Sequence, residues 1–353
     1  MKLPTGLPKG NAKLYIFAGS NLFPQFFMQI ILASAKIMRD FSPVPELIPG
    51  TPAFIDIAMR IASEMSRMTA GDIASAFRCS DAIGELNRRR FNVFGTDEAE
   101  VMPAIMAYYG QAYKHLRADT LSMDELEWAD GHLWISSCLF GLLRPSDGIP
   151  QYRMESGLKL KATEGRRITD FWRPILTEML IDSVKADDGV LVYLDTEEFR
   201  SLFDWNRVLS EIRVIEPGFH VMKNGRLVTP SVWAKTCRGA MARFLIQENA
   251  SGRLEGNASS GFPCEMDDSG TLQGGASSGD GTSACRGIQG NADDSGVLPG
   301  NASIGAGTSD CSGAGTLEEA LELIRRFSYE GFEFSPDATQ DELFPQFVRQ
   351  QSS

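Results

Sequence analysis

Positively charged side chains gather between Pro217 and Gln247, a segment without any acidic residue. The chemistry that such a segment favours is binding of an anion. Lys235 and Arg238 are spaced to share one face of a helix, and Arg243 lies beside that face. A solvated helix face that pairs with acidic residues elsewhere in the chain explains the cluster equally well. Both interpretations stay open at this point.

A second group of reactive side chains lies in FGLLRPSDGIPQYRMESGLKLKA, residues 140–162. A proline follows Arg144 and must end any helix there, and Tyr152, Arg153 and Glu155 come next in an extended stretch. The planar guanidinium of Arg153 suits a carboxylate or a phosphate, and Glu155 could hold it in place or act as acid or base. A buried structural ion pair between Arg153 and Glu155 fits the pattern equally well.

A third candidate, Lys36, follows the short apolar run of residues 29–33, which predicts a strand buried on both faces. Ligands of open α/β sheets usually bind at the carboxyl ends of strands, although a lysine there is often only a solvated strand end. Cations on separate elements repel one another, so they gather only around an anion or a carboxylate such as Glu155. On that condition we expect six cations to line one cleft: Lys36, Arg144, Arg153, Lys235, Arg238 and Arg243.

The elements that must position these residues alternate between helical and strand patterns. Apolar spacing predicts two helices within residues 51–90, with Thr69 or Asp72 as a cap, and further helices over residues 103–113, 123–143, 233–249 and 317–327. Strand patterns cover residues 189–195, 212–222, 225–233 and 329–335. The alternation predicts one α/β domain.

Residues 252–315 break this pattern, because they hold 16 of the 34 glycines and repeat themselves with a period of 26 residues. Such a composition buries too little apolar surface to offset chain entropy, so we expect a flexible insertion. Residues 1–27 lack the apolar core and cleavage site of a secretory leader, and no stretch approaches the roughly 20 apolar residues of a membrane span. We therefore expect a cytoplasmic protein with no membrane contact.

Charge and cysteine usage exclude several classes of function. The formal net charge of -12 argues against general affinity for nucleic acid, and only a local basic patch could bind it. The six cysteines form no CxxC motif, and only three histidines are present, so we expect no metal site, no disulfide framework and no cofactor.

Five stretches occur in the order in which the YaaA family carries its signatures: IILASAKIM, CLFGLLRPSDGIPQYRMESG, ITDFWRP, AKTCRGAMARFLIQEN and YEGFEFSPD. The chain therefore resembles that family from Met28 onwards. The resemblance implies a single mixed-sheet α/β domain formed by residues 28–251 and 316–349, with residues 252–315 as a low-complexity insertion and 1–27 as an extension upstream of the family's start. The residues that match the family's signatures are Lys36, Arg144, Tyr152, Arg153, Glu155, Lys235, Arg238, Gly239 and Arg243.

The resemblance also implies a bacterial protein of the peroxide stress response that limits free iron. DNA binding through a helix-hairpin-helix element belongs to the same expectation, and the segment in that place is WISSCLFGLLR, residues 134–144. The first hypothesis is thus a stress-protection protein with an anionic partner such as DNA, bound by Lys36, Arg144, Tyr152, Arg153, Lys235, Arg238 and Arg243. The alternative is an enzyme for a small anionic or nucleotide-like substrate, with Glu155 or Glu198 as acid or base. The sequence leaves open the choice between them and the oligomeric state.

Overall fold

The structure of the protein is a computed structural model that describes residues 28–42, 47–250 and 314–350. The predicted N-terminal extension, and the predicted insertion up to residue 313, lie outside these ranges. Within them, no helix combines the length and the apolar character needed to cross a bilayer.

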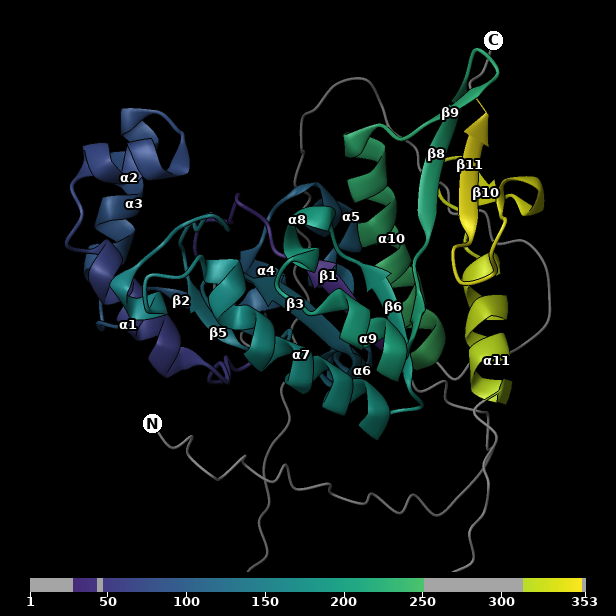
Figure 1. The fold of residues 1–353 in the computed structure, drawn as a ribbon, viewed down its shortest axis with the longest axis horizontal. Helices are drawn as coiled ribbons and strands as arrows, with labels where there is room; N and C mark the ends of the chain where they lie inside the picture. Colours follow the sequence, from purple (N-terminus) through teal and green to yellow (C-terminus); the bar gives the residue numbers. More distant parts are fainter. Residues whose placement is uncertain (1–27, 43–46, 251–313, 351–353) are drawn as a thin grey trace, which may run out of the picture. The chain divides into compact units, whose positions relative to one another are not determined.

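The core of the molecule is a five-stranded sheet in the order β4-β3-β1-β6-β7 (Figure 1). Strand β1 pairs in parallel with β3 and β6, β6 pairs in parallel with β7, and only β4 is antiparallel. Their bounds are Gln29–Ala33 (β1), Leu133–Ser137 (β3), Gly141–Leu143 (β4), Val190–Leu194 (β6) and Arg213–Ile215 (β7). Strands β3 and β6 are buried throughout, which explains their continuous apolar sequences.

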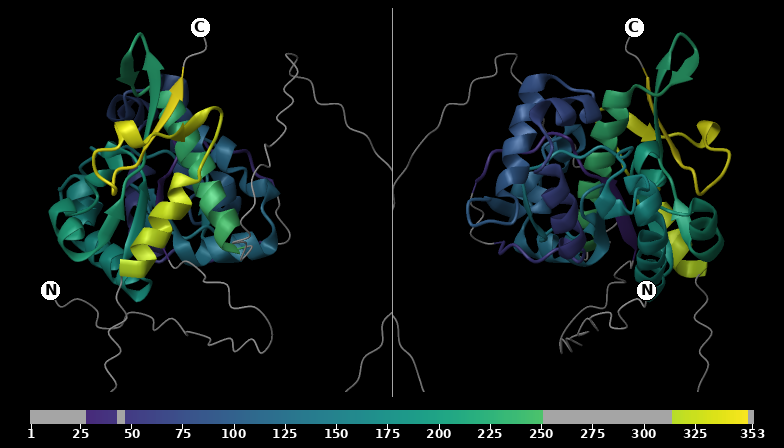
Figure 2. Two further views of the ribbon diagram at one scale, coloured as in Figure 1. Left: turned by 90° about the vertical axis from the view of Figure 1, so that its right-hand side faces the viewer. Right: turned by 60° about the vertical axis from the view of Figure 1, so that its left-hand side comes forward.

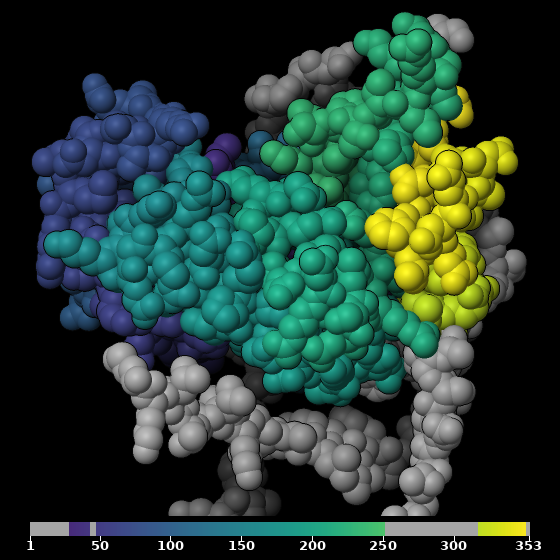
Figure 3. Space-filling model, in the orientation of Figure 1, coloured from purple at the N-terminus to yellow at the C-terminus, as the bar shows by residue number. Residues whose placement is uncertain are grey.

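The remaining strands form two smaller sheets. A mixed sheet has the order β10-β11-β8-β9, and β2 pairs with β5 as an antiparallel ribbon (Figures 1 and 2). The bounds are Phe332–Phe334 (β10), Gln346–Gln350 (β11), Gly218–Lys223 (β8), Arg226–Val228 (β9), Val101–Pro103 (β2) and Gly148–Pro150 (β5). The green surface of the β8–β9 hairpin stands at the top of the space-filling view, beside the yellow surface of the last strands (Figure 3). The expectation of a single mixed-sheet α/β domain is confirmed.

Helices surround these sheets. Helix α10 contacts β1, β6 and β8, and α7 contacts β4 and β6. The helices that flank the site region are α4 (Ala104–Ala107), α5 (Gln111–Leu116), α6 (Met123–His132), α8 (Glu197–Arg200) and α10 (Ser231–Ala250). The others are α1 (Ile55–Met65), α2 (Ala70–Phe77), α3 (Asp81–Val93), α7 (Ile168–Ala186), α9 (Trp205–Glu211) and α11 (Ala314–Arg325). Three short 3-10 turns span Ala118–Thr120, Lys161–Thr163 and Pro336–Ala338.

Residues 51–90 form three helices where two were expected. Helix α1 ends at Met65, and a new helix, α2, begins after Thr69. The Thr69 hydroxyl accepts a hydrogen bond from the Asp72 amide, and the Asp72 carboxylate accepts one from the Thr69 amide. Helix α2 ends because Arg78 adopts the left-handed conformation, with φ of 49°. The predicted cap is therefore Thr69, and Asp72 is its reciprocal partner.

Two other expectations about elements are wrong. The helix expected over residues 123–143 ends at His132, because the following apolar residues have no polar face and enter the buried strands β3 and β4. The single strand expected over residues 212–222 divides at Pro217 into β7 and β8, which belong to different sheets. Both errors arise because a short apolar run does not reveal whether it forms a helix or a strand, or to which sheet a strand belongs.

Helix α10 approaches α5 closely at Gly239. A Cβ atom at this position would lie 1.9 Å from the carbonyl oxygen of Ala112, which is shorter than any real contact. Gln111 Nε2 on α5 also donates to Thr236 Oγ1 on α10, at 2.9 Å. The absence of a side chain at Gly239 therefore sets the distance between these two helices.

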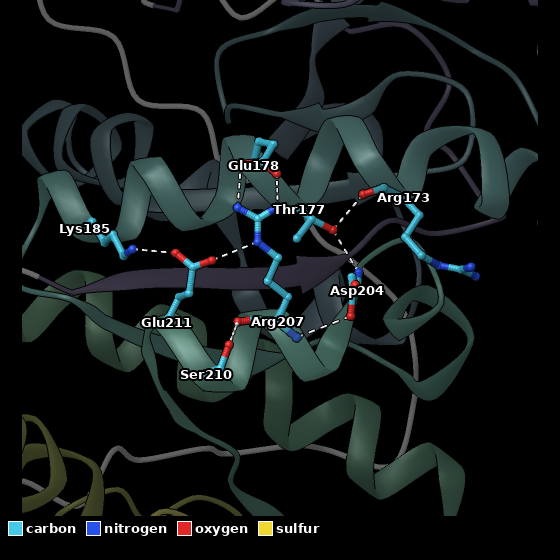
Figure 4. Close-up of polar contacts among 8 residues, drawn as sticks. All are labelled: Arg173, Thr177, Glu178, Lys185, Asp204, Arg207, Ser210 and Glu211. Carbon is cyan, nitrogen blue, oxygen red and sulfur yellow. Dashed lines mark hydrogen bonds and ion pairs between the residues drawn. The ribbon is translucent and has the colours of Figure 1, made fainter.

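Helices α7 and α9 are joined by polar contacts across their exposed surfaces (Figure 4). Arg207 of α9 reaches Glu178 of α7, with 2.9 Å between Nη2 and Oε2, and Glu211 accepts from Lys185 at 2.6 Å. The Thr177 hydroxyl accepts from the Asp204 amide at 2.8 Å. Exposed ion pairs contribute little stability individually, so we regard this network as orienting α9 rather than holding the fold together.

Candidate functional site

A cavity of about 740 Å³ opens at the carboxyl ends of β1 and β6. Strand β1 lies between β3 and β6: the chain passes from β1 to β3 on one side and later returns to β6 on the other, so the strand order changes direction at β1. Such a switch point is where open α/β sheets usually bind ligands. The cavity is lined by Cys138 and by residues from five segments, which lie within 32–37, 109–114, 152–154, 194–199 and 229–238.

The first two candidate cations share one carboxylate. Lys36 Nζ lies 2.6 Å from Glu155 Oε2, and Arg153 Nη2 lies 2.8 Å from Glu155 Oε1. Lys36 and Arg153 line the cavity, whereas Glu155 is not among the lining residues. Glu155 thus occupies the place between cations in which a carboxylate or an anion was expected, and it orients both side chains.

Helix α10 supplies two further cations one turn apart, Lys235 and Arg238, and both line the cavity. Arg238 is half-buried, and within the part of the chain that the structure describes its guanidinium makes no hydrogen bond or ion pair. Burial lowers the pKa of Arg238, and the nearby Asp195 opposes that change. A poorly solvated guanidinium without a bound carboxylate is suited to receive an anion.

Two tyrosines line the inner part of the cavity. The Tyr152 hydroxyl is hydrogen-bonded to Tyr108 Oη at 2.6 Å and to Ser137 Oγ at 2.7 Å. Tyr113 is 3% exposed, and its buried hydroxyl has no hydrogen-bond partner among the residues that the structure describes. Burial raises the pKa of both tyrosines, so both hydroxyls stay protonated, and that of Tyr113 is available as a donor to a ligand.

Asp195 is a functional candidate that sequence reasoning missed. It follows β6, is 1% exposed, and accepts hydrogen bonds from Ser136 Oγ and, at 2.6 Å, from the Thr196 amide. Burial raises the pKa of Asp195 to about 7. The available signal was an acidic residue at the carboxyl end of a fully apolar strand, the same position that drew attention to Lys36.

Glu198, the other proposed acid or base, lies on α8 with an exposed side chain at the cavity wall. Its Oε1 accepts from Ser156 Oγ at 3.0 Å. Ile37 and Val232 also line the cavity and are 64% and 62% exposed, beside exposed charged residues such as Lys36 and Lys235. A ligand would therefore meet both apolar and charged groups at the entrance.

Arg144 and Arg243 are not among the residues that line this cavity, and the expected set is corrected accordingly. Arg144 Nη1 donates to Gln29 Oε1 at 3.2 Å, and Gln29 begins β1, so Arg144 lies at the opposite end of the sheet from Lys36. Arg243 Nη1 donates to the carbonyl oxygen of Arg117, at 2.9 Å, just beyond the C-terminus of α5. The antiparallel direction of β4 explains the position of Arg144, and Arg243 acts as a cap for α5.

Comparison with known proteins places the chain among its relatives. The family model described as "Peroxide stress protein YaaA" matches residues 28–262. The chain belongs to the YaaA family. A UPF0246 protein from Phocaeicola vulgatus is 38% identical over 237 residues, which cover 67% of this chain and 93% of the relative. UPF0246 proteins from Bacteroides thetaiotaomicron and Maricaulis maris are 35% and 34% identical, over 69% and 62% of this chain and 94% and 83% of theirs.

The YaaA-family expectation of a helical hairpin at residues 134–144 is wrong for this segment. Strand β3 runs to Ser137, three residues turn, and β4 begins at Gly141, with every residue buried from Leu133 to Leu143. The Ser137 hydroxyl accepts from the amides of Leu139 and Phe140, at 3.2 and 3.1 Å, and so stabilises the turn. A buried β-hairpin offers no backbone amides to a nucleic acid phosphate.

The cysteine that lines the cavity is expected to react slowly with peroxide, although the YaaA family is named for peroxide stress. Cys138 is 4% exposed, and burial raises the pKa of its thiol, so the reactive thiolate is scarce at neutral pH. We expect sulfenic acid trapping after hydrogen peroxide treatment to label Cys138 and Cys237 more slowly than the less buried Cys79. Mass spectrometry measures this, with the unfolded protein as control. Rapid labelling of Cys138 in the folded protein would contradict the expectation.

Proposed function

We propose that this YaaA-family protein acts in cytoplasmic peroxide stress protection by binding a small anionic molecule in the cavity at the ends of β1 and β6. The observation that carries the proposal is Arg238, a half-buried cavity-lining cation without a hydrogen bond or ion pair among the described residues. Removing a guanidinium from water without a partner is unfavourable, and a bound anion would offset that cost.

The remaining contacts give the ligand an orientation. Its negatively charged group would lie against Arg238 and Lys235, with the Tyr113 hydroxyl, which has no partner in the described part of the chain, as a further donor. Lys36 and Arg153, held by Glu155, would contact a second polar part. Ile37 and Val232 would cover an apolar body at the mouth. This combination supports a small organic anion, such as a nucleotide, because most ligand pockets pair a few polar groups with an apolar wall.

The size of the cavity favours a small molecule over duplex DNA. Pockets for small ligands usually enclose about 300 to 1,000 Å³, and about 740 Å³ falls within that range. A duplex is bound mainly through many phosphate contacts on an open basic surface. In this cavity Glu197 and Glu198 lie on the same wall, which would weaken the attraction for a polyanion.

A catalytic version of the proposal rests on the same site. Glu198 is exposed to the cavity and could act on a bound substrate, whereas Glu155 is held between Lys36 and Arg153. Turnover that disappears in Glu198→Gln, while ligand affinity is retained, would establish an enzyme. Unchanged turnover in that variant would assign any reaction to another residue.

The test of the proposal is anion binding by native protein and by Arg238→Ala. A thermal-shift screen with inorganic phosphate, sulfate, nucleoside monophosphates and ferrous iron would select the ligand, and calorimetry would give its Kd. We expect Arg238→Ala to weaken binding of the selected anion by about tenfold or more, because a charge-assisted hydrogen bond contributes about 1.5–3 kcal/mol.

The matched control is Lys223→Gln, which removes one positive charge from an exposed position of β8 outside the cavity. It should leave the affinity unchanged. Equal affinity of Arg238→Ala and native protein would refute the proposed site. Salt-sensitive binding of a DNA duplex that survives Arg238→Ala would support the DNA hypothesis at another surface.

A further inference from the structure

A buried carboxyl group, that of Asp195, lies between two residues that line the cavity. Asp195 follows cavity-lining Leu194 and precedes cavity-lining Thr196, yet it is only 1% exposed itself. Both of its oxygens are occupied, one by Ser136 Oγ and the other by the Thr196 amide. Asp195 therefore cannot move toward a ligand without losing these bonds, and it influences the site through space.

The group that connects Asp195 with the cavity is Arg238. The two side chains interact electrostatically, but they do not form an ion pair within the described structure. Arg238 is the charge that the proposed function assigns to the ligand. An ionised Asp195 and a bound anion would therefore be two negative charges that share one guanidinium in a poorly solvated environment.

We propose, on the basis of the proposed function, that Asp195 is a positioning residue that couples binding of an anion at Arg238 to uptake of a proton by its buried carboxyl group. A neutral Asp195 leaves the whole charge of Arg238 to the ligand, whereas an ionised Asp195 competes for that charge and repels the ligand. The ligand class that fits is a small acid. When its anionic group binds Arg238, Asp195 takes up a proton, so the negative charge of the ligand replaces that of Asp195.

The electrostatic surroundings of Asp195 support this coupling. Burial is the largest cause that raises the pKa of Asp195 to about 7, and Glu198 on α8 raises it further, while Ser136, Thr196 and Arg238 lower it. The other titratable groups that Asp195 influences are Tyr113, Tyr193 and Cys138. Burial raises the pKa of each of these three, so they stay neutral near pH 7 and add no competing proton.

The sign of the coupling follows directly. Below about pH 7 Asp195 is protonated before the ligand arrives, so affinity should not change with pH. Above that pH a proton must bind together with the anion, so the apparent Kd should rise by up to about tenfold per pH unit. The number of protons taken up per bound anion should approach one. Thermodynamic linkage requires this number to equal the slope of log Kd against pH.

Inorganic sulfate is the probe for this test, because its charge is constant from about pH 5.5 to about pH 8.5, whereas phosphate itself titrates in that range. Calorimetry in two buffers of different ionisation enthalpy measures both the Kd and the proton uptake of the native protein. We expect a flat Kd at the acidic end, a steep rise at the alkaline end, and proton uptake close to one at about pH 8.

Two variants distinguish Asp195 from other groups. Asp195→Asn keeps an amide oxygen for the Thr196 amide and an NH₂ group facing Ser136 Oγ, but it cannot ionise, so it should bind sulfate with a Kd independent of pH. His115→Gln, which removes a partly buried histidine beside cavity-lining Gln111, should retain the native slope.

Each outcome decides the proposal. Sulfate binding by native protein without pH dependence and without proton uptake would overturn the coupling and leave the proposed function intact. A slope retained in Asp195→Asn, or lost in His115→Gln, would also overturn it. If sulfate and the other anions bind at no pH, the proposed function fails and this inference fails with it. Should Asp195→Asn not fold, proton uptake by native protein still decides between the outcomes.

Discussion

Replacing Gly239 by alanine is expected to destabilise the protein by at least about 3 kcal/mol, the upper end of ordinary overpacking. The added Cβ would lie 1.9 Å from the Ala112 carbonyl oxygen and 2.6 Å from its carbonyl carbon. These are backbone atoms of α5, so relief requires the whole helix to move away from α10. Because α5 carries Gln111 and Tyr113 while α10 carries Arg238, the same movement should also weaken anion binding.

Urea denaturation of Gly239→Ala would measure the loss of stability. The control is Gly131→Ala on α6, where an added Cβ meets no atom of the described residues within 4 Å. That variant should be neutral or more stable by about 0.5–1 kcal/mol, because alanine favours helix more than glycine does. Native-like stability of Gly239→Ala would show that the two helices separate easily and that the cavity tolerates their movement.

Asp195→Asn is expected to make the protein more stable at alkaline pH, by up to about 4 kcal/mol. The pKa of Asp195 rises from 3.8 to about 7 on folding, so the folded state holds the proton more tightly than the unfolded state does. The stability that this carboxyl group contributes is fully present below about pH 4 and is lost as the pH rises through about 7. Asparagine does not ionise and avoids that loss.

The difference in unfolding free energy between Asp195→Asn and native protein should therefore increase from about pH 4 to about pH 7 and then level off. Urea titrations at several pH values would measure it. Ser136→Ala offers a comparison, because it removes the hydroxyl that donates to Asp195 and leaves the carboxyl group titratable. A difference that does not change with pH would show that folding does not raise the pKa of Asp195.

Sequence reasoning predicted those cavity-lining residues that strand ends and helix periodicity reveal. Lys36 was found because a short apolar run predicts a buried strand, and its carboxyl end is a preferred ligand position. Lys235 and Arg238 were found because their spacing places them on one helix face. Both rules depend only on residues that are close in sequence, so they do not require knowledge of how the elements pack together.

The residues that were misplaced or missed depend on tertiary structure. Arg144 was assigned to the cleft because nothing in the sequence shows that β4 runs antiparallel and returns the chain to the far end of the sheet. Asp195 was missed because an acid after a strand usually lies in a solvated loop, whereas here it is hydrogen-bonded to Ser136 of β3 and α10 packs against β6. The helix expected over residues 123–143 failed because apolar residues on all sides fit a buried strand as well as a buried helix.

The exposed positions of Ile37 and Val232 at the mouth of the cavity have an evolutionary consequence. Their side chains pack little against the core, so substitutions there cost little stability, in contrast to a change at Gly239. Selection can therefore vary the entrance freely while the inner cations stay fixed. One or two such substitutions could change which apolar part of a ligand the protein prefers, while the same anionic group is bound. Each intermediate variant would remain folded.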